Sequence, residues 1–93
     1  MSDRSSQKPR VHFRLAATAN PQLLVMEGNK YKVVFSNESS AVIFLGPIGL
    51  TGTLASNGFG LPGGLVHEET YSEEAWYCAI GAGTGMISGY IIY

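Results

Sequence analysis

WYCAIGAGTGMISGYIIY, residues 76–93, is the stretch that decides the fold. Two apolar segments flank the small-residue run 81–85, which predicts two strands joined by a tight turn. Side chains alternate between the faces of a strand, so Trp76, Cys78 and Ile80 share one face, which we assign to the core. A segment this apolar has to be paired inside a sheet or covered by a neighbour. It therefore indicates an all-β domain.

The second strand of this hairpin is apolar on both faces. Ile87, Ile91 and Tyr93 lie on one face, whereas Met86, Tyr90 and Ile92 lie on the other. A strand of a two-layer sandwich usually keeps one face in water. A loop, the N-terminal segment or another subunit has to cover the second face, and we favour another subunit. The predicted subunit-contact residues are Met86, Tyr90, Ile92 and Tyr93.

Length and composition indicate one domain that works in an assembly. The chain has 93 residues, of which 45% are hydrophobic and only 14% are charged. The usual charged share is roughly 25%, and a small monomer, being mostly surface, should not fall below it. The shortage of charge favours a homo-oligomer or a member of a larger assembly. No apolar run approaches the roughly 20 residues of a membrane-spanning helix, and we expect no membrane partner.

Short strand signals recur along the rest of the chain, whereas helical periodicity is nearly absent. Candidate strands are residues 11–15, 22–26, 31–35, 41–45, 50–54 and 65–71, with Phe59 and Leu61 as apolar anchors between turns. With the final hairpin they give about eight strands at the spacing typical of a sandwich or small barrel. The predicted fold is a single small antiparallel β-sandwich, jelly-roll-like, with an immunoglobulin-like arrangement as second choice.

Three of these segments carry predictions about their faces. Alternation along 31–35 points Tyr31 inward together with the other odd-numbered residues. Segment 41–45 is apolar at every position, so both of its faces should be covered. Segment 65–71 is polar and acidic, which is typical of an edge strand.

Residues 1–10 form a short basic N-terminal arm, followed by the domain at residues 11–93. The arm has no apolar stretch of the kind found in a secretory signal, so we expect none here. The rest of the chain is mildly acidic and has no nucleic-acid motif, so we do not favour nucleic acid as a partner. We favour an arm that orders against a neighbouring protein, with a solvated tail as the alternative. Its predicted contact residues are Arg4, Lys8 and Arg10.

No group of residues makes a convincing catalytic, metal or cofactor site. Cys78 with His12 or His67 could form a nucleophile–base pair, but Cys78 lies on the core face, where cysteine behaves as a small hydrophobe. One cysteine and two distant histidines lack the spacing of a zinc site. The run 81–85 is not spaced as a phosphate loop, and a strand pattern follows it instead of a helix. We expect no enzyme activity, and the lone cysteine fits a reducing compartment.

The glutamates and one glycosylation sequence have simple interpretations. Glu68 and Glu69 are adjacent in a strand and point to opposite faces, and Glu73 and Glu74 lie in a predicted loop. A solvated acidic edge is therefore favoured over a glycosidase pair. Asn37 begins an Asn-x-Ser sequence, which we interpret as a polar loop tip.

The aromatic residues near the C-terminal hairpin have three interpretations, namely a sugar-stacking platform, an interface cluster and plain core. The residues concerned are Phe59, Trp76, Tyr77, Tyr90 and Tyr93. Trp and Tyr are enriched at protein interfaces. We assign Trp76 to the core, and Tyr90 and Tyr93 to an interface.

Four segments together resemble small structural proteins of tailed bacteriophages. They are NESSAVIFLG (37–46), SNGFGLPGG (56–64), AWYCAI (75–80) and GTG (83–85), followed by a closing apolar strand. In that family a variable strand ending near LG precedes an NG-aromatic turn, and a WYAI…GT hairpin closes a small β-sandwich. The resemblance covers residues 30–93 and leaves the arm outside. Cys78 replaces a residue that is commonly small there, and segment 65–71 is unusually acidic.

The resemblance implies a capsid decoration (cement) protein or a module of a head or tail fibre. We therefore expect a non-enzymatic virion structural protein, a homotrimer on the capsid surface, made in the host cytoplasm. Its partners would be the major capsid protein or other virion proteins. The alternative is a fibre or adhesin module that recognises a host-surface glycan through exposed aromatic residues.

Overall fold

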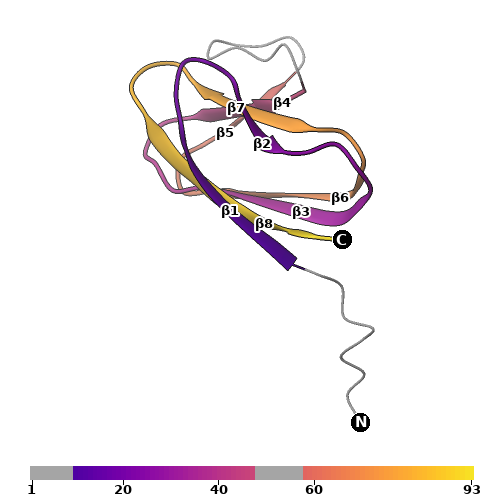
Figure 1. Cartoon of the computed structure of the whole chain (residues 1–93). Helices are drawn as coiled ribbons and strands as arrows, with labels where there is room; N and C mark the ends of the chain where they lie inside the picture. Colours follow the sequence, from indigo (N-terminus) through magenta and orange to yellow (C-terminus); the bar gives the residue numbers. More distant parts are fainter. Residues whose placement is uncertain (1–9, 48–57) are drawn as a thin grey trace.

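The computed structural model describes residues 10–47 and 58–93, and every regular element within these ranges is a β-strand (Figure 1). The strands are β1 (Arg10–Ala17), β2 (Gln22–Val25), β3 (Lys30–Asn37), β4 (Ile43–Gly46), β5 (Phe59–Leu61), β6 (Val66–Ser72), β7 (Trp76–Ile80) and β8 (Gly85–Ile92). They confirm the predicted all-β class and both strands of the final hairpin. The predicted strand at 50–54 lies outside the described residues. Within the described ranges, no helix is long and apolar enough to cross a membrane.

The strands pair as one long antiparallel ribbon that is rolled into two layers. β1 pairs with β8, β2 with β7, β3 with β6, and β4 with β5. Rolling brings β3 beside β8 and β4 beside β7, which gives the orders β1-β8-β3-β6 in one sheet and β2-β7-β4-β5 in the other. We call these sheet A and sheet B. The pairing is that of a jelly roll, so the first choice of topology is confirmed over the immunoglobulin-like one.

Alternation along the strands places one face of each sheet in a shared core. Trp76, Cys78 and Ile80 of β7 are buried there as predicted, together with Ile87 and Ile91 of β8. The buried cluster consists of Ala17, Val25, Val33, Phe35, Ile43, Leu45, Leu61, Trp76, Cys78, Ile80, Ile87 and Ile91. Each large side chain in such a cluster stabilises the fold by roughly 1.5–3 kcal/mol relative to an exposed position.

A glycine in the middle of β8 allows two aromatic rings to meet on the core side of sheet A. The register places Gly89 between Phe13 of β1 and Phe35 of β3. The two rings lie 6.0 Å apart between their centroids, in a tilted arrangement. A Cβ atom on Gly89 would collide with the carbonyl oxygen of Val34 and lie 2.7 Å from Cζ of Phe13. Only glycine therefore fits this position.

Asn37 ends β3, and its buried side chain joins the two sheets. Its Nδ2 donates to the carbonyl oxygens of Ala41 and of Leu61 in β5, both at 2.7 Å. Its Oδ1 accepts from the backbone N–H of Ser39 at 2.9 Å and from the Ser39 hydroxyl at 2.7 Å. The predicted polar loop tip is therefore wrong at this residue, because its amide is 1% exposed and fully hydrogen-bonded. Such an amide is not accessible for glycosylation.

Two apolar residues that were expected to be covered are exposed instead. Tyr31 shares the core-side face of β3 with Val33 and Phe35, but it is 41% exposed, because it lies near the end of sheet A, where the register between β3 and β8 begins at Lys32. Val42 is 42% exposed, because β4 begins at Ile43 and the preceding residues belong to the connection from β3. The edge position predicted for 65–71 is confirmed, since β6 is the last strand of sheet A.

We expect Asn37→Ala to lower the free energy of unfolding by about 2–4 kcal/mol, because the buried Leu61 carbonyl loses its donor and the bond to the partly buried Ala41 carbonyl is lost with it. Asn37→Asp is nearly isosteric but loses the same two donors, so it should destabilise at least as much. Chemical denaturation measures both variants. The matched control is Asn20→Ala, because Asn20 is exposed and its hydrogen bonds with Thr18 use only its backbone. A loss for Asn37→Ala no greater than that of the control would contradict the structural role.

Candidate interaction surface

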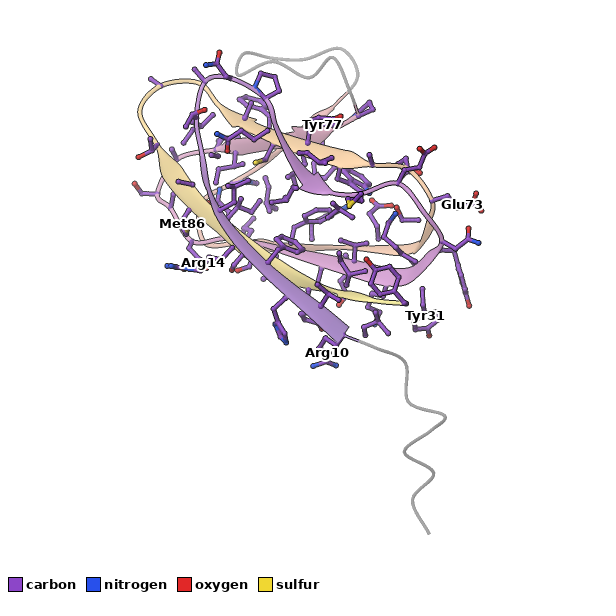
Figure 2. The ribbon with its side chains drawn as sticks, in the orientation of Figure 1. Arg10, Arg14, Tyr31, Glu73, Tyr77 and Met86 are labelled. Atoms are coloured by element: carbon purple, nitrogen blue, oxygen red, sulfur yellow. The ribbon has the colours of Figure 1, made fainter. Side chains whose placement is uncertain are left out.

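The face of sheet A that points away from the core carries the predicted contact residues of β8. Met86, Tyr90 and Ile92 all lie on this face and are half-buried. β8 lies between β1 and β3, so each outward side chain has a neighbour on both sides, as Tyr90 has in His12 and Val34. Figure 2 shows Arg10, Arg14 and Met86 on this outer side, with Tyr77 of β7 on the opposite side of the molecule.

Tyr90 is held in place by two residues of β1. The guanidinium carbon of Arg10 lies 4.6 Å from the centroid of the Tyr90 ring, within the range of a cation–π interaction. The ring of His12 lies 5.9 Å from the Tyr90 ring between centroids and is tilted by 50°. Arg10 thus belongs to β1 and not to a separate arm, whereas Arg4 and Lys8 lie outside the described residues.

A second charged residue of β1, Arg14, forms an ion pair on the same side of the sheet. Its Nη2 donates to Oε1 of Glu38 at 3.1 Å, and its Nε donates to Oε2 at 3.4 Å. The hydrogen bond from Arg14, followed by one from the Ser88 hydroxyl, holds the pKa of Glu38 below its ordinary value. The hydrogen bond with Glu38 in turn raises the pKa of Arg14. The charge of Arg14 is therefore paired, and the basic excess near the N-terminus is smaller in the fold than in the sequence.

The outer face is hollowed into an open depression of about 640 Å³, which we call the sheet A depression. Its lining residues are His12, Phe13, Arg14, Val34, Ser36, Glu38, Val66, Ser88, Gly89 and Tyr90. Val66, on the edge strand β6, is 59% exposed. The depression is lined by apolar side chains and by the ion pair between Arg14 and Glu38. Protein interfaces likewise have an apolar core and a polar rim.

Tyr93 is separated from the other predicted contact residues. It follows β8 and lines a different hollow together with Tyr31 and Tyr71. The structure therefore groups Met86, Tyr90 and Ile92 on one face and places Tyr93 elsewhere. The role of all four in subunit contacts stays a prediction.

The residues considered for nucleophilic catalysis lie in different environments. Cys78 is completely buried, and burial raises the pKa of its thiol to about 11. His12 is on the outer face of sheet A, so that sheet separates it from the buried thiol. His67 is bound instead to Glu69, with Nε2 at 2.6 Å from Oε2. Within residues 10–47 and 58–93, no three His, Cys, Asp or Glu side chains are grouped so that they could hold a metal ion.

The pair of His67 and Glu69 could have been predicted from the alternation of β6, which puts both residues on one face. The Phe59 ring packs on the imidazole, with 4.6 Å between centroids. Glu68 points to the opposite face, where its carboxylate lies 3.7 Å from the Lys32 ammonium. The predicted separation of the two adjacent glutamates is thus confirmed. Glu73 and Glu74 lie in the loop between β6 and β7, also as predicted.

Lys30 is a buried cation that no sequence pattern indicates. It is 3% exposed, and its Nζ donates to the carbonyl oxygens of Met26 at 2.8 Å and Gly28 at 2.6 Å. Burial lowers the pKa of this ammonium, and three nearby carboxylates oppose the shift, those of Glu74, Glu27 and Glu73. The side chain therefore fixes the loop between β2 and β3 from inside.

We expect native Cys78 to resist thiol reagents at neutral pH, because the thiolate is the reactive form and burial disfavours it. Labelling should proceed only through opening of the fold and be slower than in denaturant by a factor of about 100 or more. The matched control is Ala82→Cys in a Cys78→Ala background, which moves the thiol to an exposed turn. Labelling of native Cys78 as fast as that control would contradict its place in the core.

Comparison with known proteins identifies no family for this chain. No protein family and no curated protein matches it. One solved structure that is similar comes from work on Bacillus endospore appendages, which are described there as a family of disulfide-linked pili. The two chains are 17% identical and align with a TM-score of 0.44 over 100% of this chain and 95% of that one.

Proposed function

We propose that the protein is a non-enzymatic structural subunit that contacts its neighbours through the outer face of sheet A. The observation that carries this proposal is the sheet A depression, an open hollow lined by Tyr90 of β8 and, on the far side of β3, by the exposed Val66 of β6. Apolar surface of this kind marks an interaction site when it is contiguous. The low share of charged residues in the whole chain, 14%, supports the same conclusion.

The finer proposal is a capsid decoration protein of a tailed bacteriophage, located on the virion surface and made in the host cytoplasm. The resemblance of residues 30–93 to phage structural proteins supports it, as does a jelly-roll topology of the kind that viral capsid proteins use. Its partners would be the major capsid protein or other virion proteins. A subunit that binds the assembled shell better than separated capsid subunits stabilises the shell by linkage.

The polar groups around the depression suit a partner with acidic residues. Arg10 stacks on Tyr90 and places its positive charge beside the apolar surface, whereas the charge of Arg14 is already paired with Glu38. A positive group next to an apolar contact aligns the partner more than it increases affinity. We propose that the copies associate as a trimer through this face, which is what the resemblance to phage decoration proteins implies. Closed cyclic symmetry would then bury this surface on every copy.

The full chain should be a trimer in native mass spectrometry at micromolar concentration. Val66→Glu puts a charge into the depression, and Tyr90→Ala removes the ring that Arg10 and His12 hold there. Each should weaken association at least about tenfold, because burying an unpaired carboxylate is costly and aromatic anchors carry much of the binding energy. The matched control is Val42→Glu, an equally simple change at an exposed valine on the connection from β3 to β4. A wild-type protein that stays monomeric at every concentration would contradict self-association.

The role of the arm is tested by co-sedimentation with assembled phage heads and, separately, with dissociated capsid subunits. We expect the full chain to bind the assembled heads preferentially. A variant that lacks residues 1–9 should show lower occupancy, and the occupancy of the full chain should fall as salt screens the charges. Arg10→Ala is measured separately, because Arg10 belongs to β1 and contacts Tyr90. Equal occupancy for the full chain and the truncated variant would remove the arm from the mechanism.

A further inference from the structure

Three tyrosines from distant parts of the sequence line one hollow of about 290 Å³. They are Tyr31 in β3, Tyr71 in β6 and Tyr93 just after β8. The remaining lining residues are Asn29, Lys30 and Glu73. Figure 2 shows Tyr31 and Glu73 on the side of the molecule where the described chain ends in Figure 1. The hollow therefore lies apart from the sheet A depression, with which it shares no residue.

The rings of Tyr31 and Tyr71 form a corner that is open to solvent. Their centroids are 5.4 Å apart and their planes meet at 81°, so one ring presents its edge to the face of the other. Tyr71 is 76% exposed and Tyr93 is 43% exposed. Large aromatic rings are usually packed away from water. This cluster offers aromatic surface to something outside the chain.

The backbone of Tyr71 gives independent evidence that this ring has a function. Its φ angle is 55°, and it is the only non-glycine residue with positive φ in the described ranges. A bulky side chain in this region is strained. The turn of the backbone here places Ser72 in the core, where its hydroxyl accepts from Nε1 of Trp76 at 3.0 Å, and it leaves most of the Tyr71 ring in water. Strain of this kind clusters at ligand sites, where surrounding structure maintains it.

Polar groups of fixed position surround the rings. The backbone N–H of Gly28 donates to the carbonyl of Glu73 at 2.9 Å and ties the β2–β3 loop to the β6–β7 loop. Lys30 is held by two carbonyls of the same loop and uses two of its three N–H donors there. The hollow is therefore built on restrained loops, which lowers the entropy cost of binding.

We propose that this hollow binds a neutral pyranose ring, as a free sugar or as the terminal unit of a glycan. The negative faces of aromatic rings attract the partly positive C–H groups of one sugar face. The Asn29 amide and the Glu73 carboxylate can then pair with ring hydroxyls. The carboxylates of Glu27, Glu73 and Glu74 around the single ammonium of Lys30 disfavour an anionic sugar. The hollow is small enough to suit one ring.

The proposal is tested by two-dimensional NMR titration of the full chain with the methyl glycosides of glucose, galactose, mannose and N-acetylglucosamine. At least one should bind with a Kd on the order of 1–10 mM, as expected for a ligand of this size. Its shifts should gather at residues 29–31, 71–73 and 93. No binding by any of the four at about 100 mM, or shifts gathered elsewhere, would overturn the proposal.

Tyr71→Gly is the decisive variant, because it removes the ring and at the same time relieves the backbone strain. It should lower the affinity at least about tenfold and raise the Tm. Tyr93→Ala, outside any strand, is the second variant and should lower the affinity without changing the Tm. The matched control is Tyr77→Ala on sheet B, which should bind as the wild type does. If Tyr71→Gly and Tyr93→Ala both bind the sugar with the wild-type affinity, the proposal is overturned.

The sugar site and the assembly proposal can fail separately. Tyr71→Gly and Tyr93→Ala should keep the oligomeric mass of the wild type, whereas Val66→Glu should keep the wild-type affinity for the sugar. If Tyr93→Ala changes the mass, or if the signals of the hollow shift on dilution without sugar, a second copy of the chain occupies the hollow and the sugar proposal is wrong.

Discussion

The amide of Asn37 fixes one end of the sandwich, and much of the surface depends on it. Its two donors reach Ala41, on the path from sheet A to sheet B, and Leu61, in the short edge strand β5. The backbone carbonyl of the same residue accepts from the backbone N–H of Gly64 at 2.9 Å, just before β6 begins. The Asn37 side chain thus sets the crossover between layers and the position of β5, and its backbone carbonyl ties down the start of β6. The exposed Val66 of the sheet A depression is presented by the strand that starts there.

Strand alternation predicted faces correctly where a strand lies in the middle of a sheet, as for Tyr90. It placed Tyr31 on the correct face but did not predict its exposure, because alternation does not reveal that the residue lies near the end of the sheet. Strand alternation also could not identify Asn37 as buried, because the carbonyl groups that accept hydrogen bonds from its amide lie 4 and 24 residues away in the sequence. The aromatic hollow could not be predicted from the sequence either, because only the pairing of the strands brings Tyr71 and Tyr93 together. The face of β8 was predictable, and the places where loops meet were not.

The molecule separates two kinds of surface. The sheet A depression is broad, apolar and built on paired strands, so it suits another protein with a matching face. The aromatic hollow is small and built where two loops and the end of β8 converge, so it suits a small ligand. Since the two share no residue, contact through one leaves the other open. A subunit fixed to a surface by its sheet would therefore display the tyrosines of the hollow independently.

The ribbon pairing also has a consequence during synthesis. Arg10 of β1 pairs with Ile92 of β8, so β1 cannot complete its pairing until residue 92 has left the ribosome. At roughly 5–20 residues per second the wait is on the order of 4–16 s. An unpaired strand is prone to aggregate over that time, and charge protects it. Arg10 and Arg14 on β1 supply that charge to the nascent chain, before either residue has found its native partner.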